Sequence, residues 1–291
     1  MNRSNAGRLP GGARMVLLVA VLGAVGLMSL RGFSRQFIYL PWRWSAEEAR
    51  RWNPGYEEIW IPVDEGVSLH GWLYRGTHPD LAVLVCHGNA GHLGVQEGLL
   101  EPYRRLGVTA LLFDYRGYGL STGSPDEEGI AADALAAFDR LSDLTALPAH
   151  RIIVHGKSLG GAPAARTAIA RRPAGLILES AFTSALELGR YHYPFLPVSW
   201  LLQDRLDTVG RLPEVRAPIL ILHGERDRIV PPVHAERLAR AAGDHARRIM
   251  LPQADHNNTY RADSQKYLEE LGRFLDQALA GGGTAGSGPD L

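Results

Sequence analysis

The chain has 291 residues, 45% of them hydrophobic, and its 31 basic and 31 acidic residues give a formal net charge of zero. No basic stripe with interleaved aromatic residues occurs, so the composition argues against a nucleic-acid partner. The single cysteine, Cys86, excludes an intrachain disulfide, and no Cys/His cluster has the spacing of a zinc site, so we expect no metal and no organic cofactor.

The first predicted element is an uncharged run, Met15 to Leu30, with arginines on both sides. A cleaved signal peptide fits its modest length, with Ala24-Val25-Gly26 as a cleavage site and a secreted or periplasmic domain as the result. An uncleaved membrane anchor fits the flanking charges and the aromatic residues that follow. These aromatic residues would lie at headgroup level: Phe33, Phe37, Tyr39, Trp42 and Trp44. We favour an anchor and linker over residues 1–45, in an orientation that the charges do not define.

An α/β pattern begins at Glu57 and continues to about Leu279. The predicted strands are Glu57–Val63, Val67–Arg75, Leu81–Cys86, Val108–Phe113, Arg151–His155, Gly175–Leu178, Ile219–Leu222 and Arg248–Leu251. The predicted helices are Leu93–Leu106, Asp126–Leu141, Ser158–Arg172, Pro232–Ala242 and Asp263–Leu279. This alternation predicts one domain, residues 57–279, with a mostly parallel sheet, helices on both faces and an antiparallel hairpin at one edge.

Two stretches fall outside this alternation. Residues 182–213 are rich in aromatic residues and proline and show no clear strand, which favours a short lid over the site or, alternatively, a helix pair that merely packs on the sheet. Residues 281–291 are polar and Gly-rich and are predicted to be a disordered tail.

A candidate nucleophile lies in Gly156-Lys157-Ser158-Leu159-Gly160, between a predicted strand and a predicted helix. A chain that turns sharply from strand to helix can hold a serine hydroxyl clear of the backbone. The flanking glycines are required because side chains there would collide across the turn. Ser158 is therefore the predicted nucleophile.

A serine hydroxyl needs a base to remove its proton and an acid to orient that base. In this architecture both are expected after later strands, in the order Ser, Asp or Glu, His. Asp227 follows one predicted strand and His256 follows the next, so we predict these as the acid and the base. Glu179, which also ends a strand, is the alternative acid.

Two backbone N–H groups should bind the oxyanion that forms during attack. We predict Leu159, directly after the nucleophile, and Asn89, in the glycine-rich loop after the third strand. Lys157 beside the nucleophile favours anionic substrates, packs locally or lies in solvent. The histidines at strand ends, His87, His155 and His223, are expected to be buried and hydrogen-bonded.

The stretches that carry a family resemblance are His87–Gly91, Phe113–Ser121, Gly156–Gly161, Asp227–Pro231 and His256-Asn257. Over roughly residues 57–279 the chain resembles a serine hydrolase of the α/β-hydrolase superfamily, most closely the Bem46-like group. The resemblance implies Ser158, Asp227 and His256 as the triad and a structural role for Asp114–Ser121. It also makes a membrane-associated protein with an N-terminal hydrophobic helix unsurprising.

We therefore expect a serine hydrolase that cleaves carboxylic esters or thioesters, including lipid-like ones, through an acyl-enzyme intermediate. A peptidase or amidase with the same triad is one alternative. A non-catalytic binding protein on the same fold is another, because a fold does not by itself define an activity. The expected partners are a small-molecule or lipid-like ester and, through residues 15–30, a membrane.

Overall fold

The computed structural model describes residues 15, 16, 23, 26, 34–53 and 55–281. Apart from Met15, Val16, Gly23 and Gly26, the predicted anchor lies outside the described residues, as does the predicted tail apart from Gly281. Within the described ranges, none of the helices has both the length and the apolar character needed to cross a bilayer.

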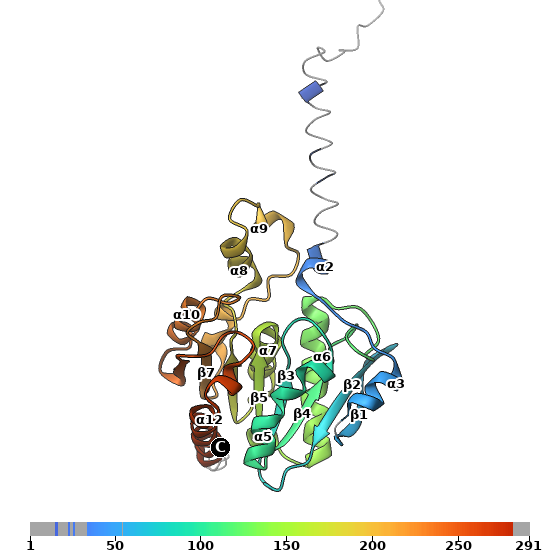
Figure 1. Ribbon diagram of the computed structural model, residues 1–291, viewed down its shortest axis with the longest axis vertical. Coiled ribbons are helices and arrows are strands. Elements are labelled where there is room, and N and C mark those ends of the chain that lie inside the picture. Colours follow the sequence, from blue (N-terminus) through green and yellow to red (C-terminus); the bar gives the residue numbers. More distant parts are fainter. Residues whose placement is uncertain (1–14, 17–22, 24–25, 27–33, 54, 282–291) are drawn as a thin grey trace, which may run out of the picture.

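One eight-stranded sheet forms the centre of the molecule, in the order β1-β2-β4-β3-β5-β6-β7-β8 (Figure 1). The strands are β1 Glu57–Asp64, β2 Val67–Tyr74, β3 Ala82–Cys86, β4 Thr109–Phe113, β5 Ile152–Lys157, β6 Gly175–Glu179, β7 Ile219–Gly224 and β8 Ala246–Leu251. β1 pairs with β2, and β2 with β4, in antiparallel fashion; the other pairings are parallel. The mostly parallel sheet with an antiparallel hairpin at one edge is therefore confirmed.

The helices cover both faces of the sheet. The main helices are α3 Ala46–Trp52, α5 Glu101–Leu106, α6 Glu127–Thr145, α7 Gly161–Arg171, α10 Val233–Ala242 and α12 Ser264–Gly281. Buried residues of α6, α7 and α10 belong to one apolar cluster with alternate strand residues, and those of α3, α5 and α12 belong to a second cluster. Strands β3, β5 and β6 are buried along their whole length because helices cover both of their faces.

Short helices occupy the remaining connections: α2 Ser34–Ile38, α4 Leu93–Gln96, α8 Ala185–His192, α9 Val198–Leu201 and α11 Thr259–Ala262. Residues 180–218 form the insertion, which contains α8, α9 and the 3-10 turn Val209–Glu214 and connects β6 to β7. It rises beyond the carboxyl ends of these strands, beside α2 (Figure 1). A lid function for it stays a prediction.

The predicted helix Leu93–Leu106 is divided in the structure. α4 ends at Gln96, a 3-10 turn follows, and α5 begins at Glu101 with Pro102 in its first turn. Proline is favoured in a first turn because its missing N–H leaves no intrahelical bond unmade there, whereas inside one long helix it would break a bond. Pro102 therefore marks the start of a separate helix, α5, which the apolar periodicity alone does not indicate.

Candidate active site

Ser158 lies at the turn between β5 and α7. Its φ angle is +51°, in the left-handed region that non-glycine residues rarely adopt. A Cβ atom on Gly156 would lie 2.4 Å from the Gly160 carbonyl oxygen, and one on Gly160 would lie 2.0 Å from the Cys86 carbonyl oxygen. The predicted need for both glycines is thus confirmed, and their packing holds Ser158 in its strained conformation.

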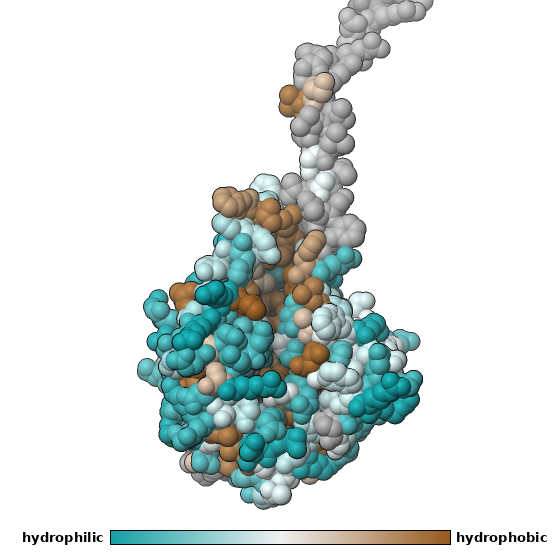
Figure 2. Space-filling model, viewed as in Figure 1, coloured by the Kyte–Doolittle hydropathy of each residue, from teal (hydrophilic) through white to brown (hydrophobic). Residues whose placement is uncertain are grey.

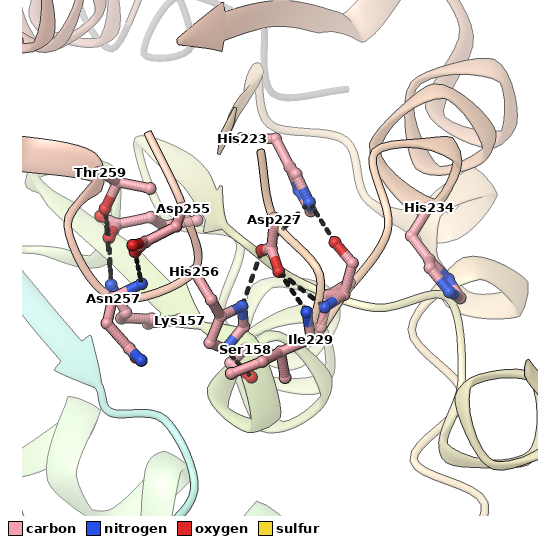
Figure 3. Close-up of polar contacts among 12 residues, drawn as sticks. Lys157, Ser158, His223, Asp227, Ile229, His234, Asp255, His256, Asn257 and Thr259 are labelled. Carbon is pink, nitrogen blue, oxygen red and sulfur yellow. Dashed lines mark hydrogen bonds and ion pairs between the residues drawn. The ribbon is translucent and has the colours of Figure 1, made fainter. Parts of the chain in front are cut away.

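The structure brings Ser158, His256 and Asp227 together at the carboxyl end of the sheet (Figure 3). The Ser158 Oγ–His256 Nε2 distance is 3.1 Å, and His256 Nδ1 lies 2.7 Å from Asp227 Oδ2. A carboxylate only accepts hydrogen bonds, so Nδ1 carries the imidazole proton and Nε2 is free to accept one from the serine. All three residues are buried, with His256 and Ser158 each 8% exposed.

Local hydrogen bonds fix the loop that carries the acid. Asp227 Oδ1 accepts from the backbone N–H groups of Ile229 and Val230, at 2.9 and 2.7 Å. Burial alone would raise the pKa of Asp227, but the hydrogen bond and the charge of His256 outweigh it and lower that pKa. Asp227 therefore stays ionised and acts as a fixed negative charge behind the imidazole.

The loop that carries the base is fixed in a similar way. Asp255 Oδ1 accepts from the N–H groups of Asn257 and Asn258, and Asn258 Oδ1 accepts from Asp255 N–H (Figure 3). Asp255 itself is exposed, and its carboxylate bonds to the turn rather than to His256. Its carboxylate shapes the turn from which His256 points toward Ser158.

The two predicted oxyanion donors are in suitable surroundings. Leu159 is the second residue of the 3-10 turn Ser158–Gly160, where an N–H has no acceptor within the turn. Across the described ranges, no acceptor is recorded for the Asn89 N–H. Gly88, the residue before Asn89, lies against the nucleophile, because a Cβ there would be 3.6 Å from Ser158 Cβ.

An N-terminal arm, residues 38–43, holds the loop of Asn89. The Asn89 side chain accepts a hydrogen bond from Leu40 N–H at 3.0 Å and donates one to the Ile38 carbonyl at 2.6 Å. Backbone bonds join Gly91 N–H to the Leu40 carbonyl and Trp42 N–H to the Gly91 carbonyl. Sequence reasoning missed this contact, because most of it runs through the main chain.

The arm also corrects the prediction for the aromatic residues after the apolar run. Tyr39 and Trp44 are buried, at 2% and 9% exposure, and belong to the two apolar clusters of the domain. They therefore do not lie at a lipid headgroup level. Phe37 and Trp42 are exposed, and Phe33 lies outside the described residues.

Lys157 and Glu179 form a buried ion pair beside the nucleophile, with Lys157 Nζ 2.6 Å from Glu179 Oε1. Glu179 also accepts from the hydroxyls of Thr259 and Tyr267. Burial acts to raise the pKa of Glu179, but Lys157 and His155 hold that pKa well below its ordinary value. The alternative assignment of Glu179 as the acid is not supported, because its recorded partners do not include His256.

A cavity of about 390 Å³ opens next to this pair, between α4, α5 and α11. Its wall includes Asn89, the predicted oxyanion donor, and also Lys157 and Asn257, the chain neighbours of Ser158 and His256. Trp42 and Leu99 contribute apolar surface, and the other polar lining residues are Gln96, Glu179, Asn258, Thr259, Tyr260, Arg261 and Tyr267. Ser158 and His256 do not themselves line this cavity; residues adjacent to them in the chain do.

The remaining strand-end histidines are buried, as expected. His155 Nδ1 is bonded to the Tyr103 hydroxyl, and His223 Nε2 to the Val230 carbonyl. His87 Nε2 lies 3.6 Å from the buried Asp114 carboxylate, within the stretch 114–121 that the resemblance treats as structural. Within residues 34–53 and 55–281, no three His, Cys, Asp or Glu side chains converge as metal ligands.

Comparisons with known proteins identify the class to which this fold and site belong. Residues 82–198 match the family described as alpha/beta hydrolase fold. The Pyrococcus furiosus esterase Pf2001 superposes with a TM-score of 0.64 over 82% of this chain and 95% of its own, at 19% sequence identity, which is a likeness of fold. The chain therefore has the α/β-hydrolase fold.

Relatives in sequence narrow the assignment. An uncharacterised protein of Mycobacterium tuberculosis is 38% identical over 90% of this chain and 94% of its own length. Protein bem46 of Schizosaccharomyces pombe is 32% identical over 78% of both chains. This chain belongs to the Bem46-like group of α/β-hydrolases, and the predicted resemblance is confirmed.

Proposed function

We propose that this protein is a serine hydrolase that cleaves carboxylic esters or thioesters through an acyl-enzyme intermediate. The observation that carries the proposal is the continuous hydrogen-bonded line from Ser158 Oγ through His256 to Asp227. Hydroxyl, imidazole and carboxylate in this order are the groups that acyl transfer requires.

In the first step, His256 Nε2 takes the Ser158 hydroxyl proton while Oγ attacks the carbonyl carbon. The Asp227 carboxylate stabilises the imidazolium, and the N–H groups of Leu159 and Asn89 bind the oxyanion. When the tetrahedral intermediate collapses, the carbonyl carbon separates from the alcohol or thiol, which leaves with the proton from His256. Water, deprotonated by His256, then releases the carboxylic acid and restores Ser158.

The proposed substrates include acyl esters of lipid-like character. We propose that residues 15–30 hold the protein near a membrane that contains them. The uncharged run Met15–Leu30 supports the tether. For the substrate class, the support is the partly apolar cavity next to Lys157 and Glu179, with Trp42, Val95 and Leu99 in its wall. The insertion also contacts the acid loop, through His192 Nε2 and the Ile229 carbonyl at 2.7 Å.

The test uses a fluorophosphonate probe and paired substrates. We expect wild-type protein to be labelled at Ser158 and to hydrolyse p-nitrophenyl esters of several chain lengths much faster than aminoacyl p-nitroanilides. Ser158→Ala should lose both labelling and hydrolysis, whereas Ser142→Ala, on the distant helix α6, should keep both. Labelling that persists in Ser158→Ala would remove the serine assignment, and faster cleavage of the amides would favour a peptidase.

A further inference from the structure

The end of the insertion exposes an unusual number of large apolar side chains. Every residue from 190 to 197 is exposed. Phe195 is 97% exposed, and Tyr193 and Trp200 are 62% and 67% exposed. We define residues 190–203 as the tip; Figure 2 shows apolar surface in brown on this part of the molecule, above a largely hydrophilic body. A contiguous apolar surface of this kind marks a contact with another molecule or with lipid.

The composition of the tip fits the headgroup region of a bilayer. Tyrosine and tryptophan are enriched at that depth, because their rings are apolar while their hydroxyl and N–H groups remain near water. Between Glu187 and Asp204 the sequence contains no acidic residue, whereas Arg190 is exposed. An anionic lipid surface attracts such a segment, and no carboxylate on it opposes the approach.

The N-terminal chain enters the fold at the base of the tip. Asp204, directly after the tip, accepts hydrogen bonds from Arg35 Nε at 3.2 Å and from the Tyr39 hydroxyl at 2.8 Å. α2 therefore lies beside the insertion (Figure 1). Three residues separate the uncharged run, which ends at Leu30, from Ser34 at the start of α2. Because both bond to Asp204, Arg35 and Tyr39 lie on the same side of the domain as the tip.

We propose that the tip inserts its aromatic side chains into the headgroup region of a bilayer that contains anionic lipids. Contact at the tip orients the protein with the carboxyl end of the sheet facing the lipid. This docking stands on the tip's own surface and does not depend on the proposed hydrolase activity.

The chain offers a clean labelling experiment, because its one cysteine, Cys86, is fully buried. A nitroxide on Phe195→Cys in the full chain reports on the tip. The matched control is His150→Cys. This position is exposed and lies just before β5, so it is at the amino ends of the parallel strands, opposite to the tip. Each protein is mixed with phosphatidylcholine vesicles, with and without phosphatidylglycerol, and the collision rates of the nitroxide with oxygen and with a water-soluble nickel chelate are measured.

We expect vesicles to raise the oxygen collisions and lower the nickel collisions at position 195, more strongly when phosphatidylglycerol is present, and to change neither at position 150. Adding Tyr193→Ser and Trp200→Ser to the Phe195→Cys protein should abolish the shift. Unchanged hydrolysis of a soluble short-chain ester, or an unchanged melting temperature if no ester is cleaved, shows that the variant is folded.

Two outcomes overturn the proposal. Equal accessibility at positions 195 and 150 in the presence of vesicles would show that the tip stays in water. A label at position 195 that is already sheltered before vesicles are added would show that another part of this chain, or a second copy, covers the tip. Neither outcome depends on catalysis, so docking and hydrolysis succeed or fail separately.

Discussion

Substitution of Asn89 by alanine tests how the oxyanion loop is held. The backbone N–H proposed to bind the oxyanion survives this change, but four side-chain hydrogen bonds disappear: those with the Ile38 carbonyl, Leu40 N–H, Ala90 N–H and the Tyr118 hydroxyl. Ala90 has a φ angle of +65°, a conformation that costs a non-glycine residue about 1–2 kcal/mol. Without the Asn89 side chain this strain can relax, and the neighbouring N–H turns away from the oxyanion position.

The expected size of the effect follows from these contacts. At about 1 kcal/mol for each neutral hydrogen bond to a group outside the loop, Asn89→Ala should lower the free energy of unfolding by about 2–3 kcal/mol. Loss of one oxyanion donor lowers kcat by about 100-fold or more, with little change in KM. The assay is steady-state hydrolysis of a p-nitrophenyl ester, together with the affinity of a boronic acid inhibitor, which should fall along with kcat.

Asn53→Ala is the matched control. Its side chain also makes several local hydrogen bonds, with Gly55 N–H, Tyr56 N–H and the Tyr56 carbonyl, but it lies before β1 rather than in the oxyanion loop. Because these partners lie within its own loop, it should lose less stability than Asn89→Ala and keep its kcat. If both variants show the same kcat, the Asn89 side chain does not position the donor, and the argument fails.

Three further predictions concern the framework of the site. Glu179→Gln should destabilise the fold by about 3–5 kcal/mol in urea unfolding, because it leaves the Lys157 ammonium buried without its ion pair. Adding Lys157→Met should restore part of this loss. If it restores none, the loss does not come from the unpaired Lys157 charge. Burial lowers the pKa of His234 to about 4 in the folded protein. As the pH falls from about 6.5 to 4, His234 is protonated in the unfolded chain but stays neutral in the folded one, so the free energy of unfolding decreases. His234→Gln should flatten that decrease, measured by urea unfolding at both ends of the range. Gly160→Ala should abolish fluorophosphonate labelling and lower the melting temperature, because its Cβ would lie 2.0 Å from a carbonyl oxygen. Gly272→Ala, whose Cβ would have its nearest neighbour at 4.0 Å, should keep both.

The parts of the fold that sequence reasoning located are those with strong local patterns. All eight strands were placed to within about two residues. The inner strands β3, β5, β6 and β7 are short apolar runs buried on both faces, and β1 alternates buried and exposed residues. Ser158, Asp227 and His256 were found through their positions after strands, and parallel strands bring their carboxyl ends to one edge. Local pattern and chain order were therefore sufficient to assemble the candidate triad.

The features that sequence reasoning missed depend on long-range contacts. Lys157 and Glu179 end two strands 22 residues apart, and only the register of β5 against β6 makes them direct neighbours. The arm meets the oxyanion loop mainly through backbone groups, which every residue possesses. Neither contact produces a periodicity or a bias in composition that could be recognised in a single sequence.

Because the arm binds through its main chain, its length constrains it more than its side chains do. The groups that meet Gly91 and Gly119 are the backbone atoms of Leu40 and Trp42. Replacement of either side chain leaves these bonds possible, whereas an inserted or deleted residue shifts every later backbone group past its partner. Homologues that share this arrangement should therefore vary freely in residue type at positions 40 and 42 while keeping the number of residues between α2 and α3 constant.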